Sequence, residues 1–204
     1  MKLTLRYSIS MLLIGFCSCT FAADTAPQML QTLLSKFRSL QAHFVETMVI
    51  QGNSQQSSGE VAIQRPNRFR WTTTTPSEQL YVSDGKQLWQ YEADLDQVTV
   101  QPINNQAALY SPLMLLSGQV SDLSRLYTIT VLGDEQFQLV PNSSDSLINS
   151  MTLTFSHGVL SELDLTNTMG QVTTIVFSKV QMNQPIDSKL FQFVPPASAD
   201  VLRG

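Results

Sequence analysis

Cysteine is scarce in this sequence. The chain has only two cysteines among its 204 residues, Cys17 and Cys19, and both lie within the first 22 residues. The remainder therefore has neither a disulfide nor a thiol nucleophile, and its hydrophobic core alone must stabilise it. Histidine is equally rare. His43 is expected on the outer side of a strand and His157 in a turn, so neither predicts a catalytic base.

Catalytic and phosphate-binding motifs are also missing. The nine glycines are isolated, which argues against a phosphate-binding loop. No Gly-x-Ser-x-Gly sequence exists to present a nucleophilic serine. Asp94 and Asp96 lie in a segment typical of a turn, without the oxygen-rich continuation of a cation site. These absences favour a binding or carrier protein over an enzyme, and they predict neither cofactor nor metal.

Charge is sparse and mainly acidic. Charged residues make up 14% of the chain, and the formal net charge is −4. Loss of Lys2 and Arg6 with an N-terminal segment would change the net charge to about −6. Nothing in this balance predicts a nucleic-acid partner.

Long apolar runs are absent except at the N-terminus. The run Ile9–Phe16 follows two basic residues and precedes small residues. This order is typical of a secretory signal peptide, and the run is too short to span a bilayer as a finished helix. We predict a signal peptide at residues 1–22, cleaved after Ala22 so that the mature chain starts near Ala23. Residues 23–204 then fit one domain.

The two cysteines bear on whether the exported protein is anchored. A lipoprotein signal ends with small residues directly before the acylated cysteine. Cys17 follows the bulky Phe16, and Cys19 follows the sequence Phe-Cys-Ser, so both are poor candidates. A soluble exported protein is the favoured interpretation, and an anchor at Cys19 is the alternative.

Helical spacing opens the predicted mature chain, and strand-like alternation follows. Apolar residues recur three and four positions apart in PQMLQTLLSKFRSLQAHF, which predicts an amphipathic helix. The alternation begins near Ala42 and indicates a strand, after which QGNSQQSSG is expected to be a turn. Ten or eleven short strands follow from the repeated alternation, with Asp84-Gly85 as a tight turn. The last of these strands is expected at LFQFVPP.

One region interrupts the strands. Residues 105–126 contain two short helical pieces, and Ser111-Pro112 is a suitable start for the first apolar one. The sequence thus predicts a mainly β fold with an α lid, because so long a sheet must curl and the helices are available to cover one face.

Three arginines gather in RPNRFRW beside the first tryptophan. Alternation places Phe69 and Trp71 on one face of a strand and Arg68 and Arg70 on the other, where we expect solvated charges. Arg65 differs because Pro66 follows it and interrupts regular pairing, so its side chain can be re-aimed.

A guanidinium aimed beneath the helices would need hydrogen-bond acceptors. The free carbonyls at the ends of the short helices in residues 105–126 could supply them. Arg65 would then hold a helical lid to the sheet. The alternative is an ordinary surface arginine.

The residues together resemble a known family. RPNRFRW, LYVSDGKQLWQYEADLDQVTV and SPLMLLSG are similar to the periplasmic outer-membrane lipoprotein carriers, the LolA family, and the likeness extends to the terminal FQFVPP. This resemblance implies an open, incomplete β-barrel of about eleven antiparallel strands, whose concave apolar face is covered by three helices. It also implies a monomeric periplasmic carrier, without cofactor. Such carriers take acylated lipoproteins from an inner-membrane ABC transporter and deliver them to an outer-membrane receptor.

The resemblance assigns roles to individual residues. It places the arginine that holds the lid at Arg65, the apolar contact of the first helix at Leu34, and the aromatic positions near the mouth at Phe69 and Trp71. Phe69 would also contact the transporter. The predicted lining of the acyl-chain cavity is Leu30, Leu33, Leu34, Phe37, Phe69, Trp71, Trp89, Met114 and Leu115. The family often has glutamine where Glu46 stands.

Other interpretations remain open at the level of sequence. An anchored outer-membrane receptor of similar fold would need acylation of Cys19. A carrier of a non-protein lipid would look alike, and an esterase acting on lipid would need a nucleophile and base that are not apparent. Leu34, Met114 and Leu115 could equally be plain core, because a cavity lining and a core have the same composition.

Overall fold

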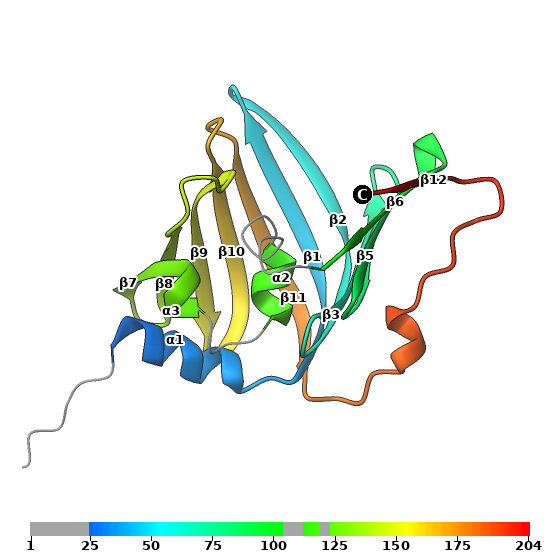
Figure 1. Cartoon of the computed structure of the whole chain (residues 1–204). Coiled ribbons are helices and arrows are strands. Elements are labelled where there is room, and N and C mark those ends of the chain that lie inside the picture. The colour runs from blue at the N-terminus through cyan, green and yellow to red at the C-terminus, as the bar shows by residue number, and fades with distance from the viewer. Residues whose placement is uncertain (1–24, 104–111, 119–122) are drawn as a thin grey trace, which may run out of the picture.

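Twelve strands form one antiparallel sheet with a single parallel pair at one edge. The computed structural model describes residues 25–103, 112–118 and 123–204. Within these residues the strand order is β12-β6-β5-β4-β3-β2-β1-β11-β10-β9-β8-β7. Strands β12 and β7 are the two edges and do not pair with each other, so the sheet is curved but open (Figure 1). The predicted mainly β fold with an open sheet is confirmed.

Within the described residues three α-helices accompany the sheet, the number that the resemblance implied. They are α1 (Ala26–Ser35), α2 (Pro112–Ser117) and α3 (Leu123–Leu126). The strands are β1 (Ser39–Ile50), β2 (Asn53–Gln64), β3 (Arg68–Thr75), β4 (Gln79–Asp84), β5 (Gln87–Glu92), β6 (Gln97–Pro102), β7 (Tyr127–Gly133), β8 (Gln136–Pro141), β9 (Ile148–Ser156), β10 (Val159–Asn167), β11 (Val172–Met182) and β12 (Asp200–Arg203). The described residues also contain the 3-10 helices η1 (Ala93–Leu95) and η4 (Ser188–Phe191).

Helix α1 is shorter than the sequence predicts. The backbone N–H of Thr25 donates to Gln28 Oε1 at 2.8 Å and so caps the first turn. The helix ends at Ser35 and β1 starts at Ser39. Phe37 therefore lies in the connection between α1 and β1. Its side chain is nevertheless buried in the same core as the leucines of the helix.

The first hairpin also differs from expectation. Only Gln51 and Gly52 form the turn, and the polar residues that follow belong to β2. Strand β2 pairs with β1 without a register shift from Ile50 opposite Asn53 to Ser39 opposite Gln64. This continuous pairing outweighs the low strand propensity of the polar stretch.

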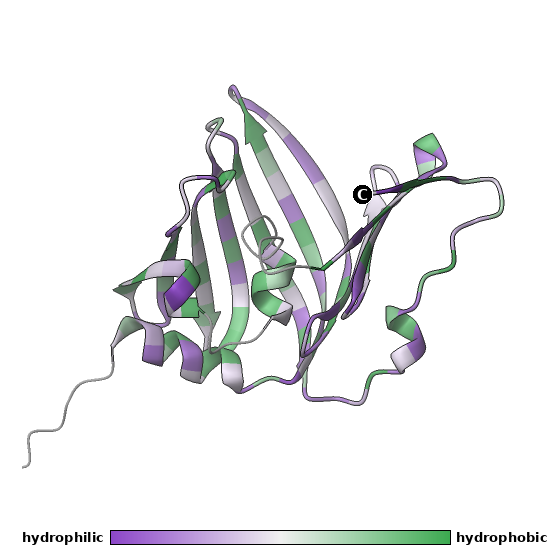
Figure 2. Ribbon diagram, in the orientation of Figure 1, coloured by the Kyte–Doolittle hydropathy of each residue, from purple (hydrophilic) through white to green (hydrophobic). Residues whose placement is uncertain are grey.

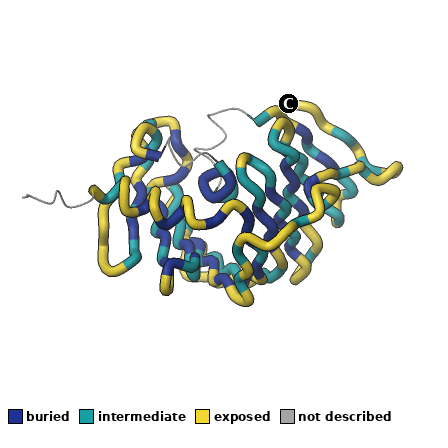
Figure 3. The backbone as a smooth tube through the Cα atoms, turned by 90° about the horizontal axis from the view of Figure 1, so that it is seen from below, coloured by how far each residue is buried: buried dark blue, intermediate teal, exposed yellow. Residues whose placement is uncertain are grey.

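Alternation assigns each strand residue to one of two faces (Figure 2). On β3, Phe69 and Trp71 point to the concave face and pair with Ile63 and Val61 of β2. The main hydrophobic core lies on this face and includes residues from all three α-helices. Buried residues concentrate inside the curve, whereas loops and strand ends are exposed (Figure 3).

The convex face has a smaller apolar cluster of its own. It consists of buried residues of β4, β6 and η4, namely Leu80, Val82, Val98, Val100 and Phe191. The C-terminal cover, which we define as residues 184–199, passes along the outside of the sheet here and contacts β3 and β4 through η4 (Figure 1).

The C-terminal cover replaces the predicted last strand. LFQFVPP begins within η4 and continues without strand pairing, and the actual last strand, β12, pairs in parallel with β6. Asp187 starts η4 by accepting the N–H of Lys189 at 3.0 Å. Across the described ranges, no helix has the length and apolarity needed to cross a membrane.

Candidate functional site

A large cavity lies between the concave face of the sheet and α2. Its volume is about 1240 Å³, which exceeds the usual range for small-molecule pockets. The apolar part of its lining comes from the sheet and from α2. These residues include Met48, Phe69, Trp71, Leu88, Leu113, Met114, Leu116, Ile148, Leu163, Leu165, Ile175 and Phe177.

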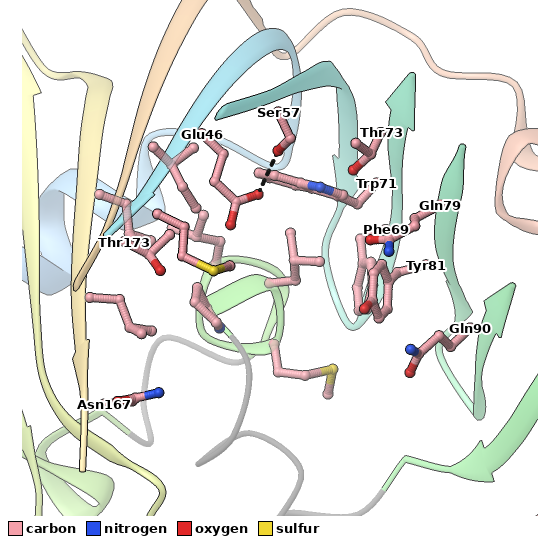
Figure 4. Close-up of a pocket in the computed structure, with 18 of the residues that line it drawn as sticks. Glu46, Ser57, Phe69, Trp71, Thr73, Gln79, Tyr81, Gln90, Asn167 and Thr173 are labelled. Carbon is pink, nitrogen blue, oxygen red and sulfur yellow. Dashed lines mark hydrogen bonds between the residues drawn. The ribbon is translucent and has the colours of Figure 1, made fainter. Parts of the chain in front are cut away.

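Aromatic rings build one wall of the cavity. Trp71 stacks on Phe44 with ring centroids 3.8 Å apart and meets Phe177 edge-on at 6.5 Å. Figure 4 shows Trp71 reaching into the cavity, and Trp71 pairs with Tyr81 of the neighbouring strand β4. Only 6% of Trp71 is exposed, so its indole is a fixed part of this wall.

Helix α2 and the following Gly118 form the roof of the cavity, and we call residues 112–118 the lid. Two hydrogen bonds connect its end to the sheet. The backbone N–H of Asn67 donates to the carbonyl of Ser117 at 2.8 Å, and Nη1 of Arg65 donates to the carbonyl of Gly118 at 3.3 Å. The Gly118 N–H closes the helix on Met114 O at 2.8 Å.

Gly118 must be glycine for this arrangement. A Cβ added there would lie 2.6 Å from the carbonyl oxygen of Met114, which is too close for a real contact. A larger residue would shift the chain and with it the carbonyl that accepts from Arg65. The lid therefore ends at the one residue type that lets it close against the sheet.

Arg65 also contacts the region after α1. Its guanidinium carbon lies 4.5 Å from the centre of the Phe37 ring, which is favourable for a cation–π contact. Its backbone N–H donates to Arg38 O at 2.9 Å. Arg65 thus joins the lid, the sheet and the connection between α1 and β1.

The guanidinium is held by fewer hydrogen bonds than it can make. Nε and Nη2 of Arg65 are buried, and within the described part of the chain they have no hydrogen-bond partner. Burial lowers the pKa of Arg65 to about 10, so the side chain is still protonated at neutral pH. A buried charge with unpaired donors is costly, and this cost opposes the favourable contacts of the guanidinium with Gly118 and Phe37.

Glu46 places a carboxyl group in the cavity. It lies on the concave face of β1, opposite Ser57 of β2 and Ile175 of β11. Ser57 Oγ donates to Glu46 Oε2 at 3.2 Å (Figure 4). Burial raises the pKa of Glu46, and the hydrogen bond from Ser57 acts in the opposite direction.

Comparison with known proteins decides the family. A family model described as outer membrane lipoprotein carrier protein LolA matches residues 35–194. The chain belongs to the LolA family. Most of its length lies inside the matched region, including the lid, Arg65 and nearly the whole sheet.

Relatives support this LolA assignment along the chain. An outer-membrane lipoprotein carrier protein from Coxiella burnetii is 40% identical over 189 residues, covering 89% of each chain. One from Azotobacter vinelandii is 38% identical over 188 residues, covering 89% of this chain and 90% of the relative. A solved structure of an uncharacterized conserved protein from Thermus thermophilus shares the fold alone, with 15% identity, a TM-score of 0.51, and coverage of 87% of this chain and 100% of that one.

The predicted cavity residues fall into three groups. Phe69, Trp71 and Met114 line the cavity. The others, except Trp89, lie in the contiguous buried core beside it; they are Leu30, Leu33, Leu34, Phe37 and Leu115.

Trp89 does not line the cavity. It pairs with Val82 and Val100, both part of the convex cluster, while its neighbours Leu88 and Gln90 line the cavity on the concave face. The prediction for Trp89 therefore chose the wrong face of β5. When both faces of a strand are covered, the alternation of its residues does not show which face lines the cavity.

Arg70 also departs from its predicted role as a solvated charge. It does lie on the outer face, but Nη1 donates to the carbonyl of Leu190 in the C-terminal cover at 3.5 Å. Burial lowers the pKa of Arg70, and the nearby Glu78 acts in the opposite direction. Strand β3 lies between β2 and β4, so its arginines are not on a sheet edge.

Several lining residues were missed from the sequence. They are mostly on the later strands, and include Leu163, Leu165, Ile175 and Phe177. Apolar residues alternate along these later strands in the sequence. The alternation does not show, however, that their apolar face continues the concave face of β1 to β3. Among the described residues, no group of three His, Cys, Asp or Glu side chains could hold a metal ion.

Proposed function

We propose that this protein carries acylated lipoproteins through the periplasm, with their acyl chains in the cavity beneath the lid. It would accept them from an inner-membrane ABC-type releasing complex and deliver them to an outer-membrane receptor. Membership of the LolA family supports the carrier function. The observation that carries the proposal is an apolar cavity of about 1240 Å³ whose roof is tied to the sheet by a partly unsatisfied arginine.

The cavity addresses the main physical difficulty of the cargo. Each buried methylene contributes about 0.8 kcal/mol, so two or three acyl chains leave a membrane at a cost of tens of kcal/mol. Water cannot accept such chains unaided. The aromatic and aliphatic lining offers them an apolar environment during transfer.

The lid addresses the opposite difficulty, which is the empty carrier. An open apolar hollow would attract other proteins or membranes. The lid buries Met114, Leu115 and Leu116 against the sheet. A closed lid therefore protects the cavity between rounds of transport.

The strength of the Arg65 contact suits a lid that must also open. A hydrogen bond from a charged group is worth roughly 1.5–3 kcal/mol, and a cation–π contact roughly 0.5–2 kcal/mol. The unpaired Nε and Nη2 oppose these gains. Burial of acyl chains can therefore outweigh closure, while closure still favours release to an acceptor.

The test is release of a lipoprotein from membranes. The purified mature protein is incubated with spheroplasts that hold a newly made lipoprotein in their inner membrane. We expect a soluble complex of one carrier and one lipoprotein, separated by gel filtration. A lipoprotein that stays in the membrane fraction, while a family carrier of known activity releases it from the same spheroplasts, would refute the proposal.

The signal peptide and the anchor are tested separately. Residues 1–22 and both cysteines lie outside the described residues. The intact mass of the exported protein distinguishes a chain that starts near Ala23 from one acylated at Cys19. The first mass agrees with a carrier that moves between membranes, and the second would instead make the protein an anchored receptor.

A further inference from the structure

The cavity carries one charged group in an otherwise neutral lining. Among the described lining residues, Glu46 is the only Asp, Glu, Lys, Arg or His. The polar remainder consists of hydroxyl and amide side chains such as Ser57, Gln79 and Asn167. Acyl chains alone have no use for a carboxylate, because they present only CH groups. Glu46 therefore needs a reason beyond apolar binding.

Glu46 lies where the apolar lining of the cavity meets the polar residues of β2, among them Ser57 and Gln55. On β1 it lies between Phe44, which is buried in the core, and Met48, which lines the cavity. Its partner on β11 is Ile175, and Figure 4 shows its side chain pointing into the cavity near Trp71. A ligand that filled the cavity would displace water from around this carboxylate.

Ser57 does not use the full capacity of the carboxylate. An ionised carboxylate offers about four acceptor positions, and the hydroxyl of Ser57 occupies one of them on Oε2. A neutral glutamine could make the same contact with Ser57 at a lower cost of burial. The charge is thus better explained by a cationic ligand group than by the β1–β2 hairpin.

The surroundings also suit a cation. Tyr81 is close enough to Glu46 to interact electrostatically with it, and it lines the same cavity. Aromatic ring faces attract ammonium groups, so Trp71 and Tyr81 add to the attraction of the carboxylate. No basic side chain among the described lining residues competes for Glu46.

We propose that Glu46 binds a primary ammonium group at the junction between acyl chains and peptide, and that the cargo includes lipoproteins with two acyl chains and a free N-terminal amine. This inference rests on the proposed carrier function. A free α-amine is largely protonated at neutral pH and donates three hydrogen bonds. An N-acylated terminus is a neutral amide and has no such charge to offer. Glu46 would therefore make the carrier prefer the first kind of cargo.

The test compares two synthetic lipopeptides on the mature protein. Both have the same two palmitoyl chains and the same short neutral peptide, but one has a free α-amine and the other is N-acetylated. Affinity is measured at pH 7 by isothermal titration in detergent below its micellar concentration. We expect the wild type to bind the free amine about tenfold more tightly, since a charge-assisted contact commonly gives a difference of this order.

Variants assign the preference to Glu46. Glu46→Gln should bind both lipopeptides alike, because it lacks the charge that distinguishes the free amine from the amide. Glu60→Gln is the matched control. It removes a negative charge from the exposed face of the same hairpin, where Glu60 lies 3.9 Å from His43, and should retain the preference. Thermal unfolding of each variant checks that it is folded.

The outcomes separate this inference from the carrier function. Equal binding of the two lipopeptides by the wild type, or an undiminished preference in Glu46→Gln, would overturn the role of Glu46 while leaving a lipid carrier. Failure of both lipopeptides to bind the wild type would instead count against the carrier function. The wild-type comparison decides the matter even if Glu46→Gln does not fold.

Discussion

Two segments cover the two faces of this sheet, and each receives a hydrogen bond from an arginine of the same region. On the concave side, Arg65 donates to Gly118 at the end of the lid, at 3.3 Å. On the convex side, Arg70 donates to Leu190 in the C-terminal cover, at 3.5 Å. On both faces, an arginine of the sheet region donates a hydrogen bond to a backbone carbonyl of the covering segment.

What lies beneath the two covers differs. Phe191 is 1% exposed and packs with the convex cluster, where the neighbouring pocket is about 320 Å³ and has a partly polar lining with His43 and Lys179. The lid covers a cavity of about 1240 Å³ with an apolar wall. A cover that rests on a filled interior is fixed by packing, whereas a cover over a cavity depends on its few polar contacts. We therefore expect the lid to move and the C-terminal cover to stay.

The largest effect on stability should come from the fixed cover. Phe191→Ala removes a fully buried ring and should lower the free energy of unfolding by about 3–5 kcal/mol, measured in urea. Met114→Ala in the lid should cost less, because the cavity already lies on one side of that side chain. Equal losses for the two variants would mean that the two covers are packed alike.

The largest effect on transport should come from the lid. Arg65→Leu removes the hydrogen bond to Gly118 and should slow transfer of bound lipoprotein to the receptor about tenfold or more, since roughly 1.5–3 kcal/mol of closing energy is lost. The carrier should fold and still load cargo. Arg70→Leu removes the corresponding contact on the other face and should transfer at the wild-type rate. The measurement is a purified carrier-to-receptor assay.

Similar transfer rates for the Arg65 and Arg70 variants would contradict the difference between the two covers. Wild-type transfer by Arg65→Leu would show that closure does not depend on this contact. A similar defect in Arg70→Leu would show that the convex cover also takes part in release.

A smaller effect in the same direction is expected at the end of the lid. Gly118→Ala places a Cβ against Met114 O and displaces the acceptor of Arg65. Transfer should slow roughly threefold, as for a weakened rather than a lost hydrogen bond. Because both changes act on one contact, the double variant with Arg65→Leu should be no slower than Arg65→Leu alone. Additive effects in the same assay would disprove a shared mechanism.

The smallest effect concerns stability of the empty carrier. Burial raises the pKa of Glu46 above its usual value of 4.5, so ionisation of this group disfavours the folded state. The penalty is absent below the usual pKa and is complete once the pH exceeds the raised one. Glu46→Gln should therefore raise Tm at pH 7 and leave it nearly unchanged near pH 4. Melting curves of both proteins across this range test it, and a gain that is equal at both pH values would contradict it.

The sequence predicted the contact of Arg65 well, because a local irregularity of the strand marks this residue. Pro66 breaks the regular strand after Arg65, and the guanidinium does meet a carbonyl at the end of a short helix. Alternating apolar residues predicted the strands, and the loss of this alternation predicted the helical segment between them. Local patterns of this kind depend on neighbours in the chain, so one sequence is enough to read them.

Prediction from the sequence was least successful where the answer depended on what covers each face. Trp89 and Arg70 were assigned by the assumption that one face is apolar and the other solvated, but the C-terminal cover buries part of the convex side. That cover was itself mistaken for a strand, because Phe191 and Phe193 alternate as strand residues do. Its packing, including the contact of Phe193 with Tyr91 at 5.9 Å, joins residues about a hundred positions apart. No local pattern encodes such a contact.

The central claim is that cargo moves the lid and not the C-terminal cover. Spin labels test it directly, because a chain that starts near Ala23 has no native cysteine. One pair joins Glu60→Cys to Leu113→Cys in the lid, and the other joins Glu60→Cys to Lys189→Cys in the cover. On saturation with a diacyl lipopeptide, we predict a longer distance for the first pair and an unchanged distance for the second. An unchanged first distance, with the lipopeptide shown to be bound, would contradict the account.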